Sequence, residues 1–325
     1  MIVIKIIFRI MEIIKYQDNQ DKSVWDDFIA QSNNGTIFHQ RKFLSYHRER
    51  TFKDCSLMFV EKAAVRAVFT GAIINNCLYS HPGASFGGFV YNQLAFKGAN
   101  QIVDLLIAYV KKQNLKEIII IPPPFIYYKK YNEVMEYCLY IKGFDIIEYY
   151  ISSFVGLEKE LFDQMHNRKK RYIKNLANQI IIKQSNDLDS FYPILVDNKL
   201  KHKATPTHTL EELKILMKLF PNKIKLLLSY KNNKVIGGAL NFITTQNSCI
   251  LFYNMINYKY QSLQIASLQI YESLKWAKQN NLKFLDIGVS QLYKNDKIVP
   301  HESLINFKEQ FGAEAMIRKV MKLKL

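Results

Sequence analysis

The sequence predicts an α/β protein of two tandem domains, each with helices packed on a mixed (α+β) sheet. The 325 residues are enough for two domains of ordinary size. Hydrophobic residues make up 49% of the chain, which provides for sizeable cores and is not typical of disorder. The expected elements also occur in the same order in both halves: one strand, two helices, three strands, then helix, strand, helix and strand. A duplicated α/β domain is the simplest explanation of this repeat.

The first half contains one complete copy of this order. A short helix capped by Ser23 carries Trp25 and Phe28 three residues apart, and a later helix is indicated by its apolar periodicity. Three prolines from Pro122 stop a buried strand, and Gly143 closes the last helix. The expected strands are Glu12–Tyr16, Cys55–Lys62, Val65–Ile74, Cys77–Ser80, Glu117–Ile121 and Asp145–Leu157. The expected helices are Ser23–Gln31, Phe38–His47, Gln101–Lys112 and Tyr131–Lys142.

The second half opens with a helix, Leu161–Asn178, and then repeats the order. A later helix begins at Thr209 with a capping box, since a glutamate follows three residues on. The stretch Cys249–Ala313 is central, because Asp286 and Ser290 lie near the end of a buried strand, where an α/β sheet usually binds a ligand. The expected strands are Ile180–Gln184, Lys223–Tyr230, Lys234–Thr244, Cys249–Ile256, Lys283–Val289 and Met316–Leu325. The further helices are Leu188–Leu200, Thr209–Leu219, Gln261–Asn280 and a short one ending in Phe307–Ala313.

The join between the halves lies near Gly156–Glu160, with no linker rich in Gly, Ser or Pro. We therefore expect one domain at residues 11–157 and a second at residues 158–325. Met11 precedes a strand pattern and could be the true start, so residues 1–10 are expected to be a non-native or disordered start. These residues do not have the pattern of a signal peptide. No stretch approaches the roughly 20 apolar residues of a transmembrane helix.

The chain is strongly basic, with a formal net charge of +17. This charge favours partners that carry phosphate or carboxylate, such as nucleic acid, nucleotide-linked sugars or an anionic membrane face. A composition that is simply rich in lysine, without functional meaning, is the alternative.

The four cysteines form no CxxC pair, and all lie within or at the start of expected strands or helices. This pattern predicts buried free thiols in a reducing compartment, not a disulfide framework or a zinc site. The four are Cys55, Cys77, Cys138 and Cys249.

The sharpest charge cluster is the basic segment, His166–Lys174, in which five of the seven residues from Arg168 are cations. Such cations could bind a diphosphate or a nucleic-acid backbone, with bidentate contacts from arginine. The alternative is the solvated face of an amphipathic helix. The position close to the join favours the functional interpretation.

Two loops are further candidates. His81–Gly88 is the most glycine-dense loop, but it matches neither a Walker loop nor a dinucleotide fingerprint, and a hairpin loop that needs glycine torsions is the alternative. His202 and His208 lie six apart in a polar loop. No further ligands stand at a useful spacing, so no metal site is expected there.

Several short stretches match one known family in order and spacing, and they cover almost the whole chain from Met11. They are Trp25–Phe28, Asn34–His39, Ser80–Gly83, Phe86–Gly88, Arg168–Ala177, Lys203–Leu210, Val235–Ala239, Ile270–Ala277, Leu285–Gly288 and Phe307–Ala313. Together they resemble the FemAB-like acyltransferase family of the GNAT superfamily. The resemblance implies two tandem GNAT-like domains packed side by side.

The resemblance also implies transfer of an activated acyl or aminoacyl group to an amine of a cell-envelope precursor, for peptidoglycan of the cell wall or for a surface polysaccharide. An amine attacks an ester or thioester, backbone N–H groups or a cation stabilise the oxyanion, and a carboxylate, histidine or water takes the proton. By similarity, Lys308 is the cation, Asp286 orients the acceptor or the base, and His301 is a further catalytic candidate. Arg168 and Arg171 contact acceptor phosphates. The other substrate-binding candidates are Lys174, His81, Ser85, Lys203, His208, Asn254 and Ser290.

One departure from the wider superfamily concerns the donor. GNAT enzymes that use acetyl-CoA bind its pyrophosphate on a glycine-containing turn before the central helix. Here that turn, Asn257–Ala266, contains no glycine, and the first half offers only Lys97–Asn100. Aminoacyl-tRNA is therefore favoured over acyl-CoA as the donor, in agreement with the basic charge of the chain. No long heptad-bearing arm of the kind found in some tRNA-using relatives is visible, so both donors stay open.

We therefore expect a cytoplasmic transferase, of the aminoacyltransferase or N-acetyltransferase type, that acts on a phosphate-bearing envelope precursor. Contacts with tRNA and with the inner face of the membrane are further expectations. The alternative is a catalytically silent tandem GNAT scaffold that binds RNA or an anionic membrane face, which the glycine-free turn and the high charge motivate.

Overall fold

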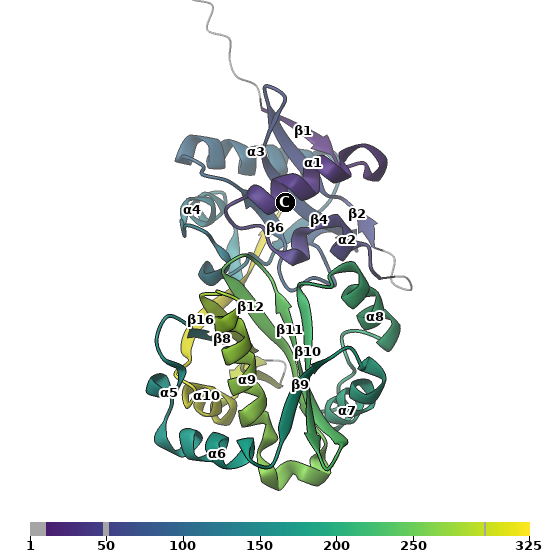
Figure 1. Ribbon diagram of the computed structural model, residues 1–325. Helices are drawn as coiled ribbons and strands as arrows, with labels where there is room; N and C mark the ends of the chain where they lie inside the picture. Colours follow the sequence, from purple (N-terminus) through teal and green to yellow (C-terminus); the bar gives the residue numbers. More distant parts are fainter. Residues whose placement is uncertain (1–10, 48–51, 296) are drawn as a thin grey trace, which may run out of the picture. The chain divides into compact units, whose positions relative to one another are not determined.

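The computed structural model describes residues 11–47, 52–295 and 297–325, which divide into two compact units (Figure 1). Unit 1 comprises residues 11–45, 52–149 and 318–325. Unit 2 comprises residues 46–47, 150–295 and 297–317. The expectation for residues 1–10 lies outside the described residues.

Unit 1 is built on a mixed sheet with the strand order β1 (Glu12–Lys15), β3 (Leu57–Glu61), β4 (Ala64–Ile74), β5 (Cys77–Ser80) and β7 (Glu117–Ile120). Neighbouring strands are antiparallel except β5 and β7, which are parallel. Two short strands that the sequence did not predict, β2 (Lys53–Asp54) and β6 (Gly88–Tyr91), pair with β4.

Unit 2 repeats this arrangement with the strand order β9 (Ile181–Ser185), β10 (Ile224–Lys231), β11 (Lys234–Ile243), β12 (Ser248–Ile256) and β13 (Phe284–Val289). Here too the first four strands are antiparallel neighbours, and the last pair, β12 and β13, is parallel. The order of the main strands predicted for the two halves is therefore confirmed, and the structure adds short strands to it.

The final strand of each half completes the sheet of the other unit. β8 (Asp145–Gly156), from the first half, pairs antiparallel with β13 of unit 2, and β16 (Glu314–Lys324), from the second half, pairs antiparallel with β7 of unit 1. The compact units thus differ from the predicted domains, 11–157 and 158–325, in which each last strand stays in its own half. This exchange of β8 and β16 results from pairing between strands that are distant in the sequence. The order of elements along the chain does not predict it.

Helices cover both faces of the unit 1 sheet. α3 (Phe96–Lys112) lies in one core cluster with Phe59, whereas α1 (Asp18–Gln31) buries Trp25 in a second cluster with Met58. Because neighbouring residues of a strand point to opposite faces, Met58 and Phe59 place the two helices on opposite sides of β3. The shorter helices of unit 1 are η1 (Ile37–His39), α2 (Arg41–Leu44), η2 (Phe125–Tyr127) and α4 (Val134–Ile141).

In unit 2, α9 (Ile265–Gln279) and α7 (Leu188–Lys201) cover opposite faces of the sheet, and Figure 1 shows them on either side of β10 and β11. A Cβ atom at Gly237 of β11 would meet the Gln269 side chain of α9 at 2.5 Å, and one at Gly238 would meet the Phe191 ring of α7 at 2.8 Å. The two glycines therefore let both helices approach this strand closely. The other helices of unit 2 are α5 (Leu161–Gln164), α6 (Asn167–Ala177), α8 (Leu210–Leu219), η3 (Tyr258–Leu263) and α10 (Glu302–Glu309).

Several helix boundaries differ from the sequence prediction. The expected helix Leu161–Asn178 is two helices, because Met165 and His166 are extended and the His166 ring accepts a hydrogen bond from the Arg168 N–H at the start of α6. The expected cap at Ser23 was wrong, since α1 already begins at Asp18.

Three further stretches were predicted with the wrong structure or extent. The expected helix Phe38–His47 is divided into η1 and α2, and the expected helix Gln261–Asn280 becomes η3 followed by α9. The segment after β13, expected to be an irregular loop, contains a hairpin of β14 (Gln291–Lys294) and β15 (Lys297–Pro300). The helices α3 and α4 begin at Phe96 and Val134.

Other local predictions are confirmed. Thr209 and Glu212 form the expected capping box at the start of α8. All four cysteines are buried and free. Within the described ranges, none of the helices has both the length and the apolar character needed to cross a bilayer.

We predict that Gly88→Ala destabilises the protein by about 1–3 kcal/mol, because Gly88 has φ +83° and a Cβ atom there would lie 2.7 Å from the Ile120 side chain. Gly98→Ala is the matched control, since its Cβ atom would meet only Leu94, at 3.7 Å, and alanine in a helix is favoured over glycine by ~0.5–1 kcal/mol. Urea unfolding of both variants measures the difference. Equal stability of Gly88→Ala and the wild type would show that the Ile120 side chain does not lie as close to position 88 as described.

Candidate active site

The parallel strands β12 and β13 pair over only three residues, Ser248–Ile250 with Phe284–Asp286, and then separate. β12 continues beside β11 as far as Ile256, and β13 continues beside β8 as far as Val289. Open α/β sheets bind ligands beyond the carboxyl ends of strands, where neighbouring strands diverge. We call the end of β13, Asp286–Ser290, together with helix α10, the β13 site.

Asp286, predicted as a catalytic residue, is fully buried in this site. Its carboxylate oxygen Oδ1 accepts hydrogen bonds from the Ser152 hydroxyl at 3.1 Å and from the Gly288 N–H at 2.7 Å. Gly288 has φ +81°, and the register between β13 and β8 shifts at this point. Asp286 therefore stabilises a bulge in β13. A Cβ atom at Gly288 would meet no atom of the described residues within 4 Å, so these residues leave open space beside the bulge.

Lys308 extends from α10 onto the same bulge and is only 5% exposed. Its ammonium Nζ donates hydrogen bonds to the carbonyl oxygens of Gly288, at 2.7 Å, and Val289, at 3.0 Å. Directly before α10, the His301 N–H donates to the Ser290 carbonyl at 3.0 Å. Asp286 and Lys308 thus lie at one bulge, and the backbone of His301 lies beside the end of β13, with the His301 ring nitrogen Nδ1 3.2 Å from the Ser303 hydroxyl.

Two buried polar atoms beside the separated strands have no protein hydrogen-bond partner within the described residues, the hydroxyl Oγ of Ser290 and the amide oxygen of Asn254. The amide nitrogen of Asn254 donates to the Ala266 carbonyl at 3.3 Å, which fixes this side chain against the start of α9. Most buried polar atoms in proteins are paired, so such atoms favour a polar ligand or water at the position. The sequence predicts substrate binding by both residues.

The basic segment forms α6 and presents an exposed cationic face. Arg168, Arg171 and Lys174, all predicted to bind substrate, are exposed. The start of α6 lies beside the end of α10, because the His166 N–H donates to the Gln310 carbonyl at 3.0 Å. These three cations are therefore carried by a helix that adjoins α10.

Lys169 differs from the other cations of α6 because it is buried, with 4% exposure. Its ammonium Nζ donates to the Ser267 hydroxyl in the first turn of α9, at 3.0 Å, and lies 4.2 Å from the centroid of the Phe307 ring. Burial, and secondarily the charge of Arg168, lower the pKa of Lys169 to about 8. Lys169 thus links α6, α9 and α10 through a cation that loses its proton more readily than an ordinary lysine.

The sequence prediction missed Lys169 because it treated the cations of the segment as one exposed group. A signal was present, since Lys169 lies four residues after Met165 and four before Ile173, both of which are buried. Side chains four apart share one face of a helix, so this spacing indicates a lysine on the inward face.

The start of α9 has the geometry that a glycine usually provides. Gln264 directly precedes the helix with φ 50° and ψ 41°, the left-handed conformation, and it makes no side-chain capping bond. The first N–H groups of a helix have no partner within the helix, so this terminus favours an anion, and Lys169 with Ser267 lies at it. The sequence argument against acyl-CoA was based on the missing glycine, and Gln264 weakens that argument.

The other predicted residues lie elsewhere. His208 is buried, with its ring nitrogen Nδ1 2.9 Å from the Tyr253 hydroxyl, and Lys203 is exposed in the connection between α7 and α8. His81 and Ser85 belong to unit 1, where His81 donates from Nδ1 to the carbonyl of the following residue at 2.8 Å. The contacts described for these four residues do not include the β13 site.

Solved structures of known proteins have the same fold. FemX matches with a TM-score of 0.72 and 11% identity over 97% of each chain. The C-terminal domain of a putative lysylphosphatidylglycerol synthetase from Agrobacterium fabrum has a TM-score of 0.62 and 9% identity, covering 94% of this chain and 92% of its own. A tandem GNAT protein from the clavulanic acid biosynthesis pathway has a TM-score of 0.55 and 8% identity, covering 97% and 98%.

No protein-family model and no curated protein sequence matches the chain. The structural similarities show that the chain has the tandem GNAT fold, and they confirm the predicted fold class and the resemblance at the level of the fold.

We predict that the stability of the protein depends on the protonation of Lys169. Between about pH 8 and the ordinary lysine value of 10.5, the folded state binds fewer protons at this residue than the unfolded state does. The free energy of unfolding therefore gains a contribution that rises with pH across this window. Lys169→Met removes it, so the variant is more stable than the wild type near pH 7, by an amount that shrinks toward pH 10.

Urea unfolding at several pH values measures this difference, with Lys174→Met, which removes an exposed cation of the same helix, as the matched control. A difference between Lys169→Met and the wild type that stays constant with pH would contradict the prediction.

Proposed function

We propose that the chain is a transferase that moves an activated acyl or aminoacyl group onto an amine, with the reaction at the β13 site of unit 2. The observation that carries the proposal is the buried ammonium of Lys308, held by the carbonyls of Gly288 and Val289 where β12 and β13 separate. The tandem GNAT fold shared with FemX supports it. The open space beside Gly288 and the Ser290 hydroxyl, which has no hydrogen-bond partner among the described residues, support a ligand at this position.

In the proposed reaction, the amine nitrogen of the acceptor attacks the carbonyl carbon of the donor ester or thioester. The tetrahedral intermediate places a negative charge on the former carbonyl oxygen, and a preorganised cation such as Lys308 stabilises that charge. Collapse of the intermediate forms the amide bond and releases the alcohol or thiol of the donor. The proton lost by the amine passes to His301 or to water, and then to the leaving group.

Asp286 acts in this scheme as a positioning residue. Its carboxylate holds the Gly288 N–H and the Ser152 hydroxyl, and so it fixes the bulge whose carbonyls bind Lys308.

For the acceptor, we propose a phosphate-bearing precursor of the cell envelope, such as a nucleotide-linked peptidoglycan precursor. The exposed cations Arg168, Arg171 and Lys174 support this, since arginine binds phosphate through bidentate hydrogen bonds. The domain of a putative lysylphosphatidylglycerol synthetase has the same fold, and its name refers to the synthesis of a membrane lipid. This similarity also supports an acceptor from the cell envelope.

For the donor, aminoacyl-tRNA is favoured by the net charge of +17, because such a charge attracts a polyanion. The start of α9, with Gln264, Lys169 and Ser267, also suits the pyrophosphate of acyl-CoA. A direct comparison of both donors decides between them.

We predict that Lys308→Met lowers kcat/KM about 10²- to 10³-fold, the usual loss when one oxyanion-stabilising group is removed. The assay uses radiolabelled aminoacyl-tRNA and, separately, acetyl-CoA, with a nucleotide-linked peptidoglycan precursor as the acceptor. Arg168→Ala is expected to raise KM for the acceptor with little change in kcat, because it removes a binding contact.

The matched control is Lys275→Met, which removes a half-exposed lysine of α9 that pairs with Glu272. Circular dichroism establishes that each variant is folded. Unchanged transfer by Lys308→Met would contradict the assignment of the site. Tight, salt-sensitive binding of RNA without turnover of either donor would instead favour the silent scaffold.

A further inference from the structure

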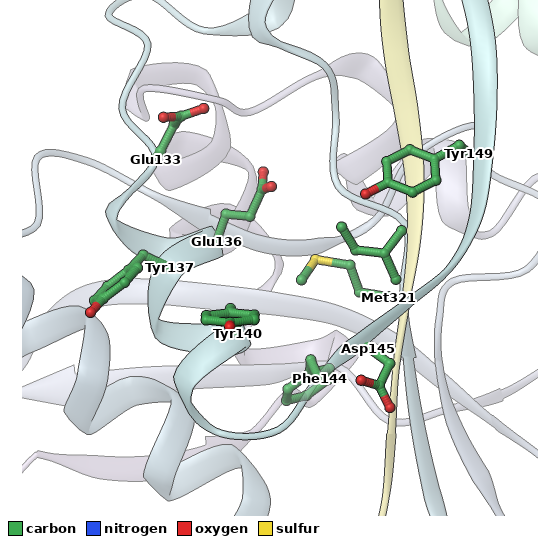
Figure 2. Close-up of a pocket in the computed structure, with 9 residues that line it drawn as sticks. Glu133, Glu136, Tyr137, Tyr140, Phe144, Asp145, Tyr149 and Met321 are labelled. Atoms are coloured by element: carbon green, nitrogen blue, oxygen red, sulfur yellow. The ribbon is translucent and has the colours of Figure 1, made fainter.

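Unit 1 contains a cavity of about 470 Å³ that plays no part in the transferase proposal (Figure 2). It lies between α4, the start of β8 and β16, all from unit 1. Gly143, with φ +87°, turns the chain from α4 into β8, which places a helix and a strand as two facing walls. The buried side chains of Phe144 and Met321 lie between these walls. A cavity of this volume is of the size that binds a small organic molecule.

Tyrosines dominate the rim of this cavity and are unusually exposed. Tyr137 is 56% exposed, Tyr140 is 70% exposed and Tyr149 is 55% exposed. Tyr137 and Tyr140 come from the helix wall, and Tyr149 comes from the strand wall with its hydroxyl pointing toward the helix that carries Glu136 (Figure 2). The negative faces of aromatic rings attract cations, most strongly organic ammonium ions.

Carboxylates stand on both walls of the cavity. Glu133 and Glu136 belong to the helix side, and Asp145 is the first residue of the strand side. Lys142, the lysine nearest to Asp145 in the sequence, pairs with Asp104 instead, at 2.6 Å. Lys319 neutralises Glu136, so Glu133 and Asp145 leave the cavity with a negative charge, opposite in sign to the net charge of +17 of the whole chain.

One wall already binds an alkylammonium group. Glu136 forms an ion pair with the ammonium of Lys319, a residue of β16 in the same unit. The Tyr131 hydroxyl donates to Glu133 at 3.1 Å, which holds that carboxylate in place at the other end of the helix wall. A neutral apolar ligand would leave these carboxylates desolvated, and an anion would be repelled by them.

We propose that this cavity binds an organic diammonium ion, a short aliphatic diamine or polyamine. One ammonium group pairs with Glu133 and with the second carboxylate oxygen of Glu136, since Lys319 pairs with Oε1 of Glu136. The second ammonium group pairs with Asp145, and the methylene chain lies against the tyrosine rings and Met321. The inference does not depend on the proposed transfer reaction.

Isothermal titration calorimetry of the full chain with 1,5-diaminopentane tests the proposal. We expect saturable binding at ligand concentrations below about 10 mM, weaker binding of pentylamine, and no binding of 1-pentanol. Added salt weakens the binding, since the carboxylates are partly exposed. Comparable affinity for 1-pentanol would overturn the ionic assignment, and tighter binding of tetramethylammonium than of the diamine would overturn the diamine assignment. Absence of heat with all of these compounds would overturn the proposal itself.

Three variants distinguish a specific site from diffuse charge. Asp145→Asn is expected to lower the affinity for the diamine roughly tenfold, and Tyr140→Leu, which keeps an apolar group but removes the ring, about threefold. Asp27→Asn makes the same charge change at an exposed position of α1, outside the cavity, and is expected to have no effect. An equal loss of affinity in Asp27→Asn and Asp145→Asn would contradict the proposal. All three positions are exposed, so the variants are expected to fold.

Discussion

The early separation of β12 and β13 determines the structure of the β13 site. After three residue pairs, each strand remains with its other neighbour, so the backbone groups on the facing edges need new partners. The carbonyls of Gly288 and Val289 accept hydrogen bonds from Lys308, and the Gly288 N–H donates to Asp286. A lysine from α10 thus completes the backbone bonding of a sheet strand. Asp286 and Lys308 thus complete the hydrogen bonding of the strand, and the same two side chains lie where the proposed reaction takes place.

Unit 1 meets the same constraint in a different way. β5 and β7 also form only three parallel pairs, but there the chain fills the gap itself. The Ile121 N–H donates to the Ser80 hydroxyl at 2.8 Å, and the Ile121 carbonyl accepts from the Gly87 N–H at 3.0 Å. A Cβ atom at Gly87 would lie 3.0 Å from the His81 backbone nitrogen. Close packing between the separated strands therefore accounts for glycine in the loop His81–Gly88. In unit 2, by contrast, the corresponding region beside Gly288 is open among the described residues.

Local patterns made much of the fold predictable from the sequence. Apolar periodicity and turn residues indicated the repeated order of elements, and the rule that polar residues after buried strands mark sites led to Asp286 and Ser290. What the sequence could not give depends on long-range contacts. The exchange of β8 and β16 follows from pairings between distant strands. The burial of Lys169 follows from the packing of α6 against α9 and α10.

The cavity of unit 1 was also outside the reach of sequence reasoning. Glu136, Asp145 and Met321 come from three elements that are brought together only by the fold. In the sequence, each of these three residues looks like an ordinary surface or core residue. The resemblance to a family could not supply it either, since the motifs that carry the resemblance lie in other stretches of the chain.

The position of Lys169 links the stability of unit 2 to the charge of its proposed substrate. A cation with 4% exposure, bonded to a neutral hydroxyl and lying beside the Phe307 ring, pays a desolvation penalty that the lowered pKa reflects. Phosphate near the start of α9 would supply the missing negative charge and favour the protonated form. Binding of an anionic substrate would then offset the desolvation penalty of Lys169. A neutral ligand cannot do so, and this difference favours the binding of phosphate.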